Sequence, residues 1–356
     1  MQPRILHINI PFVTGRCDYY GRVLFHGVVP SAKNAYLEAL TDEAQSLAPE
    51  IDAPFNTLCL SNGAIGTIDP RSFRAFLRDL KNTLPFEDEC RLYAEADPGL
   101  LSSALMAELK AGGLAMLRMR YLTSDPVESE RLERPCSLVE MQKTNIVLES
   151  LGATKIDMQI LVGAAGQTTK SLVKTLRDAV LSSNVVHCTV IPAQGHLACE
   201  SDEKAALLSV ASEFLKEHSF VRYTPLCFAK NESLVPEESN RYAEIQHVGM
   251  GLSEISHHSD MNWANCTDFE TYVNHAADPE SIVATAFEDT PDVMTARAVV
   301  RALYTLNAID ADEPFVAELS SEGLLDRSGD AAALSERGCI EFSRVASTVF
   351  ACALAR

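Results

Sequence analysis

Short apolar runs rich in β-branched residues alternate with helical patterns through the first 217 residues of the chain. The strand candidates are residues 4–10, 55–60, 90–94, 114–119, 156–162 and 185–191. The helical segments are 33–47, one that opens at Asp69-Pro70, 102–111, 138–151, 168–181 and 203–217. Six strand–helix units in succession predict a parallel sheet with right-handed helical crossovers.

Two architectures satisfy this order of elements, an open doubly wound sheet and a curled partial barrel. Both bind their ligands at the carboxyl ends of the strands, because the loops that follow parallel strands gather at one edge of the sheet. Functional residues are therefore expected in the loops after the predicted strands.

The alternation ends after residue 220. Residues 221–228 alternate like an edge strand, 229–246 are polar and typical of a loop, and Gly249 and Gly251 indicate a tight backbone passage. The stretch 275–292 is rich in Asp, Glu and Pro, which indicates a linker.

The last part of the chain has the element order of a winged helix. Helical patterns at 293–306 and 314–322 precede a hairpin pattern at 326–334 and a helix from about Glu336. Residues 281–356 carry 12 acidic and 6 basic side chains, a balance that disfavours DNA binding. We expect two domains, 1–275 and 276–356, the second a packing or interaction domain.

Composition excludes several classes of partner. The net charge of −19 repels phosphates, so we expect no nucleic acid. No apolar run reaches the roughly 18 residues of a membrane span, and the N-terminus lacks a signal-peptide pattern. The ten cysteines include no C-x2-C pair and are read as reduced thiols, so we expect a cytoplasmic protein.

The loop after the first predicted strand carries the first motif of a known family. Residues 10–20 read IPFVTGRCDYY. They resemble the loop I-P-F-C-x3-C-x-Y-C of the radical S-adenosylmethionine (SAM) enzymes of the HemN/HemW type, the oxygen-independent coproporphyrinogen dehydrogenases and heme chaperones. In that family the three cysteines hold a [4Fe–4S] cluster that SAM also ligates. Val13, Cys17 and Tyr20 stand at the three positions, so two of the cluster cysteines are missing.

A second motif follows the second predicted strand. Residues 56–70 (NTLCLSNGAIGTIDP) resemble the family's second strand and its loop Gly-Gly-Gly-Thr-Pro-Ser, which holds the amino acid moiety of SAM. Here the loop begins Ser61-Asn62-Gly63-Ala64. The resemblance implies that Ser61, Asn62 and Gly63 contact SAM.

Further segments match in the same order. Residues 95–99 (EADPG) are close to E-A-N-P-G, whose glutamate contacts SAM, and Arg134 falls where the family has a SAM-binding arginine. Residues 159–168 (QILVGAAGQT) match D-L-I-Y-G-L-P-G-Q-T, with Gln159 in place of the aspartate. These matches imply a further set of SAM-binding residues, namely Glu95, Arg134, Gln159, Gly163 and Gln167.

The resemblance reaches the C-terminus. Residues 220–223 (FVRY) match F-x-R-Y-E, residues 249–256 (GMGLSEIS) match G-L-G-A-G-A-H-S, and residues 322–338 resemble the family's C-terminal winged helix. The implied fold is α/β, an open partial (β/α)6 barrel of the TIM-like radical SAM type, with SAM across the strand ends and a small winged-helix-like domain.

The departures from the motifs change the expected chemistry. A [4Fe–4S] cluster needs thiolate ligands, which Val13 cannot supply, and the phenol of Tyr20 is a poor substitute. We therefore expect no cluster, no other metal and no radical chemistry. His7 stands where the family has a SAM-contacting tyrosine, and Tyr121 lies near the position of its glutamine. We expect Tyr20, His7 and Tyr121 to shape the acceptor side, one of them acting as a base.

Three functions remain open. The first is a SAM-dependent transferase that moves a methyl or aminocarboxypropyl group, or cyclises SAM, by polar displacement onto a small-molecule acceptor in a biosynthetic pathway. The second is a chaperone-like protein that binds heme or another tetrapyrrole. Its candidate iron ligands are Cys17, His7, His257 and His258. The third is an inactive partner of a radical SAM enzyme, and a homodimer is also possible.

Overall fold

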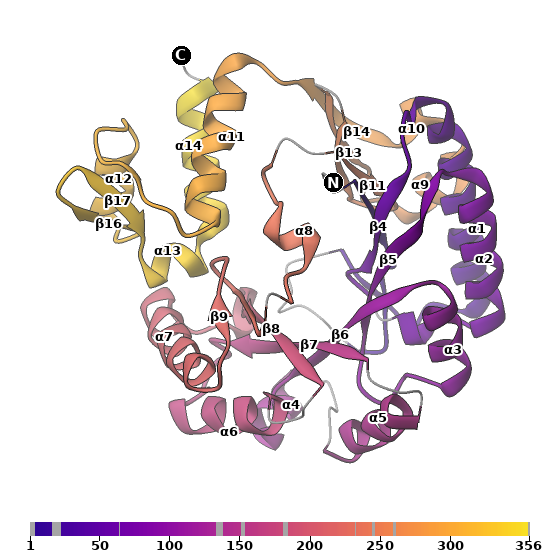
Figure 1. Ribbon diagram of the computed structural model, residues 1–356, viewed down its shortest axis with the longest axis horizontal. Coiled ribbons are helices and arrows are strands. Elements are labelled where there is room, and N and C mark those ends of the chain that lie inside the picture. The colour runs from indigo at the N-terminus through magenta and orange to yellow at the C-terminus, as the bar shows by residue number, and fades with distance from the viewer. Residues whose placement is uncertain are drawn as a thin grey trace.

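One curved sheet dominates the structure (Figure 1). The computed structural model describes residues 4–15, 23–63, 65–132, 138–150, 154–180, 184–231, 233–243, 246–258 and 261–354. Within these residues the sheet has 12 strands. In spatial order they are β14 (Val283–Glu288), β13 (Met261–Asn265), β12 (Ile255–His258), β11 (His247–Met250), β1 (Ile5–Asn9), β4 (Phe55–Ser61), β5 (Phe86–Ala96), β6 (Leu114–Leu122), β7 (Lys155–Val162), β8 (Val185–Pro192), β10 (Cys227–Ala229) and β9 (Val221–Arg222).

The middle of this sheet is parallel. β11, β1 and β4 to β8 pair in parallel, and the strands at both edges are antiparallel. All six predicted strands are confirmed as neighbours in this part. β11 adds a parallel strand that the sequence analysis interpreted only as a tight passage, because it is short and contains Gly249.

Helices form a layer around the outer face of the sheet (Figure 1). They are α1 (Pro30–Leu47), α2 (Pro70–Thr83), α3 (Ser103–Ala111), α4 (Pro126–Arg131), α5 (Leu138–Ser150), α6 (Thr169–Val180) and α7 (Ser201–Glu217). α2 shows how the sequence determines them. Its start is fixed by the Asp69 side chain, which accepts hydrogen bonds from the backbone N–H groups of Arg71 and Ser72.

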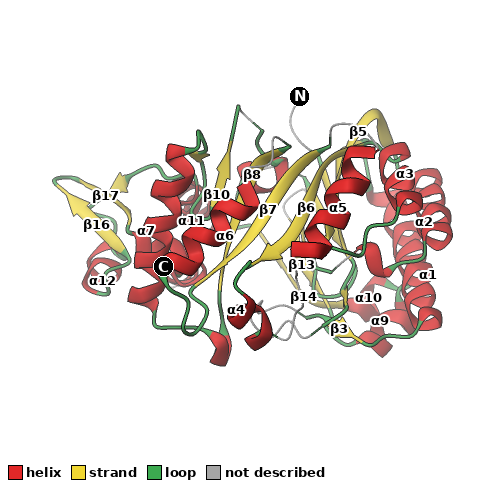
Figure 2. Ribbon diagram, turned by 90° about the horizontal axis from the view of Figure 1, so that it is seen from below, coloured by secondary structure: helices red, strands yellow, loops and turns green. Residues whose placement is uncertain are grey.

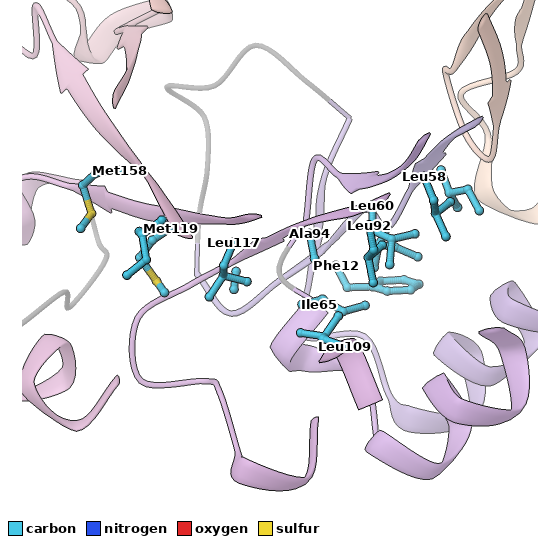
Figure 3. Packing of buried hydrophobic residues seen from close by; sticks show 14 of the residues in the cluster. Phe12, Leu58, Leu60, Ile65, Leu92, Ala94, Leu109, Leu117, Met119 and Met158 are labelled. Atoms are coloured by element: carbon cyan, nitrogen blue, oxygen red, sulfur yellow. The ribbon is translucent and has the colours of Figure 1, made fainter. Parts of the chain in front are cut away.

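The main hydrophobic core lies between this helical layer and the sheet. On β4 to β7 the outward side chains include Leu58, Leu60, Leu92, Ala94, Leu117, Met119 and Met158, and Figure 3 shows them in one cluster with Phe12, Ile65 and Leu109. Because strand side chains alternate, the residues between them face the inside of the curved sheet, called the lumen below.

The stretch expected as a linker is mostly structured. α9 (Phe269–His275) is followed by α10 (Pro279–Ile282) and then by β14, which pairs with β13. The linker prediction for 275–292 is therefore wrong, since alternating residues after α10 extend the large sheet. The division of the chain into domains at residue 275 stays a prediction.

The C-terminal elements enclose a second hydrophobic core, formed by buried residues between Ala296 and Val349. They are α11 (Pro291–Tyr304), β15 (Ile309–Asp310), α12 (Val316–Ser321), β16 (Leu325–Ser328), β17 (Ala331–Leu334), α13 (Glu336–Ile340) and α14 (Phe342–Leu354). Figure 2 shows the β16–β17 hairpin at the opposite end of the molecule from α1 and α2. The order helix, helix, hairpin, helix agrees with the prediction.

Smaller elements complete the fold. β2 (Phe12–Val13) pairs in parallel with β3 (Phe25–His26), and single 3-10 turns occupy Ala48–Glu50, Ile65–Thr67 and Gly195–Leu197. α8 (Pro236–Ser239) lies near the centre of the ring of strands and helices in Figure 1, inside a segment expected to be a loop. None of the helices in the described ranges is long and apolar enough to cross a membrane.

Candidate functional site

A row of ionisable side chains crosses the lumen on neighbouring strands. The register places Glu95, Arg118, Asp157 and His187 side by side on β5 to β8, and all four are buried. Arg118 Nε donates to Asp157 Oδ2 over 3.0 Å, and His187 Nδ1 lies 2.7 Å from Asp157 Oδ1. Burial alone would raise the pKa of Asp157, but the charges of His187 and Arg118 outweigh it and lower the pKa to about 2.

The next level toward the strand ends is also polar. Arg120 is fully buried; its Nε donates to Asp97 Oδ1 over 2.9 Å and its Nη1 to the Asn62 carbonyl over 3.0 Å. Gln159, its neighbour on β7, is 3 % exposed, and its Oε1 has no hydrogen-bond donor among the described residues. Closed barrels usually fill this space with branched apolar side chains, so a polar lumen indicates a ligand site.

Three hydrogen-bonded side chains, His7, Ser61 and Glu254, lie where β1, β4 and the loop after β11 meet. This group is called the seam below. His7 Nδ1 contacts the Glu254 carboxylate, and Ser61 Oγ contacts His7 Nε2. Glu254 also accepts a hydrogen bond from Asn62 Nδ2 over 2.7 Å. The acid fixes the imidazole ring with Nε2 toward the serine, an arrangement suited to moving a proton.

The segment of α8 closes the lumen from the inside. Glu237 Oε1 lies 3.4 Å from His7 Nε2, and Glu237 Oε2 lies 3.5 Å from Arg118 Nη1. Glu238 accepts hydrogen bonds from Arg118 over 3.2 Å and from the Tyr304 hydroxyl over 2.5 Å. Burial opposes the charge of Glu237, but His7 and Arg118 outweigh it and lower its pKa to about 2. This segment thus links the sheet to the C-terminal helices.

Two cavities lie beside this segment and share Glu237, Arg241 and Tyr242 in their walls. The smaller, of about 320 Å³, lies against the ends of β4 to β8 and is lined by Ser61, Glu95, Arg118, Gln159, Thr189, Pro192 and Gln194 among others. The larger, of about 480 Å³, lies against the seam and is lined by His7, Asn9, Asn62, His247, Glu254, His257 and Arg297 among others.

Most of the predicted SAM residues that the structure describes lie at these cavities. Ser61, Glu95 and Gln159 line the smaller one and Asn62 the larger one. Gly63 allows two loops to approach each other closely, because a Cβ at this position would lie 1.7 Å from the Ile10 carbonyl oxygen.

Gly163 and Gln167 shape their own loop. Gln167 Oε1 accepts a hydrogen bond from Gly163 N over 2.7 Å, and its Nε2 donates to the Leu161 carbonyl over 3.0 Å. Neither residue lines the two cavities, so their placement does not fit direct contact with SAM there.

The expectation for Tyr121 is wrong. The pairing of β6 with β7 skips Tyr121 between Arg120 and Leu122, which has a φ of +66°, and the tyrosine packs in the outer hydrophobic core. The inward residue at this end of β6 is Arg120. An Arg-x-Arg alternation at 118–120 was the available signal for it.

Of the remaining candidate site residues, some lie outside the described residues and only one of the two adjacent histidines lines a cavity. Cys17, Tyr20 and Arg134 lie outside the described residues. His257 lines the larger cavity, whereas His258 lies outside it and contacts the Glu50 carbonyl. No group of three or more potential metal ligands occurs within the described ranges.

Comparisons with solved structures identify the fold. The solved structure of coproporphyrinogen III oxidase (HemN) from Escherichia coli, a radical SAM enzyme, matches 98 % of this chain and 90 % of that one, with a TM-score of 0.80 and 18 % identity. The chain therefore has the α/β fold of HemN, and the predicted resemblance is confirmed. The structure of anSMEcpe with bound AdoMet matches 60 % of both chains, with 10 % identity and a TM-score of 0.45.

A curated relative is similar in sequence. The heme chaperone HemW of Haemophilus influenzae is 20 % identical over 185 residues, which cover 51 % of this chain and 48 % of the relative. The match thus spans about half of the relative's length. No family model matches the chain.

Proposed function

We propose that the protein binds SAM in the smaller cavity and uses it for polar group transfer, without an iron–sulfur cluster. The observation that carries this proposal is the convergence of three predicted SAM residues, Ser61, Glu95 and Gln159, on one cavity at the strand ends. In open α/β sheets this edge is where ligands bind.

The polar groups of the cavity fit SAM. Gln159 Oε1 is a buried acceptor that no donor of the described residues reaches, and it is suited to a ribose hydroxyl or an ammonium group. Glu95, Glu237 and Glu238 face two arginines, Arg118 and Arg241, so the lining carries one more acid than base and favours a cationic ligand.

The position of the first cluster cysteine does not fit a cluster. Val13 is 5 % exposed and packs in an apolar group with Leu122, Leu161 and Ile191. Its hydrocarbon side chain offers iron no ligand. The proposed reaction therefore uses no cluster.

The seam supplies the proton transfer in this proposal. SAM supplies, when bound, a carbon that a nucleophile attacks while the carbon–sulfur bond breaks and its electron pair returns to sulfur. His7 lines the larger cavity and Ser61 the smaller one, and Nε2 of the neutral His7 ring takes the proton of the nucleophile, directly or through the Ser61 hydroxyl. Glu254 stabilises the imidazolium that results.

Calorimetric titration of SAM into iron-free protein tests the proposal. We expect one SAM per chain, and about tenfold weaker binding in Gln159→Ala, because the buried acceptor is lost. Gln246→Ala is the matched control, since its amide contacts Asp52 away from both cavities. Absence of binding at millimolar SAM would refute the proposal.

Tetrapyrrole binding is a second candidate, favoured by the histidines of the larger cavity. Burial and the charge of His7 lower the pKa of His247 to about 3, so its imidazole is neutral and its lone pair is available to iron. Hemin titration should then give a Soret band that His247→Ala removes and His258→Ala retains. An unchanged spectrum in His247→Ala would exclude this ligand.

A further inference from the structure

Two arginines reach the larger cavity from separate elements. Arg241, which follows α8, pairs through Nη2 with Glu238 over 3.2 Å. Arg297 of α11 pairs through Nη2 with Asp289 over 2.8 Å and with Asn262 over 3.0 Å. The Nε–H group of each arginine is buried and has no acceptor among the described residues. Native proteins seldom keep such donors without a partner, and both arginines line the larger cavity, so the two donors indicate an acceptor bound there.

Two acceptors without donors line the same cavity near the strand ends. Asn9 Nδ2 donates to the Leu252 carbonyl over 2.6 Å and Asn62 Nδ2 to Glu254 over 2.7 Å, which fixes the orientation of both amides. Their Oδ1 atoms are buried and receive no hydrogen bond from the part of the chain that the structure describes. This end of the cavity therefore matches a ligand group that donates.

We propose that the larger cavity binds a small amino acid or hydroxy acid. Its carboxylate accepts from Arg241 Nε and Arg297 Nε, and its amino or hydroxyl group donates to Asn9 Oδ1 and Asn62 Oδ1. The donating group then lies on the His7 side of the cavity. This inference rests on the proposed function, because it identifies the molecule as the acceptor and its amino or hydroxyl group as the nucleophile.

The charges favour a carboxylate over a phosphate. Each guanidinium already neutralises a carboxylate of the protein, Glu238 or Asp289, so little positive charge remains for a dianion. Glu237 and Glu254 line the same cavity and would repel a second negative charge. Two available N–H donors also match the two oxygens of one carboxylate.

Binding of defined probes to the full chain tests this assignment. The probes are the common L-amino acids and their α-hydroxy analogues, each screened by saturation-transfer NMR with SAM present. The tightest probe is then titrated beside its methyl ester, its N- or O-acetyl derivative and inorganic phosphate. We expect the ester and the acetyl derivative to bind at least about tenfold more weakly than the free acid.

Two variants connect the binding to the arginines. Arg297→Lys keeps a cation beside Asp289 but removes the Nε–H, and should weaken the probe about tenfold while leaving SAM affinity unchanged, which also reports that the variant is folded. Arg241→Lys should weaken it similarly. Arg301 is an exposed arginine on α11, the helix of Arg297. Arg301→Gln is the control and should leave the affinity for the probe unchanged.

Each contrary outcome is separable. If no probe binds while SAM does, or if the ester or phosphate binds as well as the acid, the inference fails and the proposed function stands. Probe affinity unchanged in both lysine variants also overturns it. If the acid binds with the expected arginine dependence but SAM does not bind, the carboxylate site stands and the proposed function fails.

Discussion

The two walls of the lumen differ in how they depart from the HemN-type motifs. On β5 and β7, Glu95 retains the motif's glutamate and Gln159 replaces aspartate by a neutral side chain that is one methylene longer. At the seam, His7, Ser61 and Glu254 stand where the motifs have tyrosine, glycine and alanine. Three residues distant in sequence have thus acquired one hydrogen-bonded chain. Under the proposed function, the first wall keeps a SAM-binding glutamate of the motif, whereas the seam carries a different set of reacting groups.

The largest expected effect concerns the charged row on the first wall. Asp157→Asn leaves Arg118 and His187 buried beside a neutral amide, and should lower the free energy of unfolding by about 3–5 kcal/mol at pH 7. Urea denaturation measures this. Asp178→Asn, which breaks an exposed pair with Lys174, should cost less than about 0.5 kcal/mol. If the two substitutions lowered the free energy of unfolding equally, the buried row would contribute no more to stability than a surface ion pair.

The Asp157 carboxyl also makes the free energy of unfolding depend on pH in the acid range. The folded pKa of Asp157 lies below its usual value, so its stabilisation is complete above about pH 4 and is lost as the pH falls toward 2. The difference in unfolding free energy between the wild type and Asp157→Asn should shrink over that range. A difference independent of pH would contradict the pairing.

The helix behind the seam has the opposite pH dependence. Glu43 of α1 is buried and accepts hydrogen bonds from Gly251 N over 2.8 Å and Asn265 Nδ2 over 2.6 Å, yet burial raises its pKa to about 7. Its folded pKa exceeds its unfolded value near 4.5, so its stabilisation is full below pH 4.5 and is lost as the pH rises through 7. The loss should amount to roughly 3 kcal/mol by pH 8.5.

Thermal unfolding from pH 4.5 to 8.5 tests the role of Glu43. The wild type should lose stability relative to Glu43→Gln as the pH rises, because the glutamine cannot ionise. Parallel pH profiles for the two proteins would assign the dependence to other groups.

A smaller effect distinguishes reaction from binding at the seam. Glu254→Gln removes the charge that stabilises the His7 imidazolium, and should lower the rate of group transfer about a hundredfold while SAM affinity changes little. Glu288→Gln, on the exposed face of β14, is the control. A loss of SAM binding equal to the loss of rate would place Glu254 in ligand binding instead.

The smallest effect comes from restoring a motif residue. Ser61→Gly removes the hydroxyl between His7 and the smaller cavity, and one hydrogen bond of about 1 kcal/mol limits the change in SAM affinity to about fivefold. Titration of SAM into this variant measures the change. A hundredfold loss would mean that Ser61 contributes more to SAM binding than one hydrogen bond.

The sequence predicted the outward face of the barrel better than the lumen. Leu117 and Met119 alternate as buried strand residues should, and the helices that cover them begin at recognisable caps such as Asp69. Tyr121 was misassigned because it was placed by the family resemblance. The alternation of Leu117 and Met119 continues to Tyr121 and puts it in the outer hydrophobic core.

Contacts between residues far apart in the sequence could not be predicted from the sequence pattern. Glu254 is 247 residues from His7, and Arg297 is more than 50 residues from Arg241, so only the folded chain brings each pair to one cavity. β11 was missed for a related reason, since its glycine and its four residues give a weak strand signal. The sequence around a single acidic residue or arginine in a loop does not indicate which distant residues it will contact.

The central claim is that SAM binds without a cluster. Protein purified without oxygen and treated with iron and sulfide would be analysed for bound iron, and SAM would then be titrated into the same sample. We predict substoichiometric iron, no absorption band near 400 nm and one SAM per chain. About four irons per chain, with SAM binding only in their presence, would contradict the account and return the protein to radical chemistry.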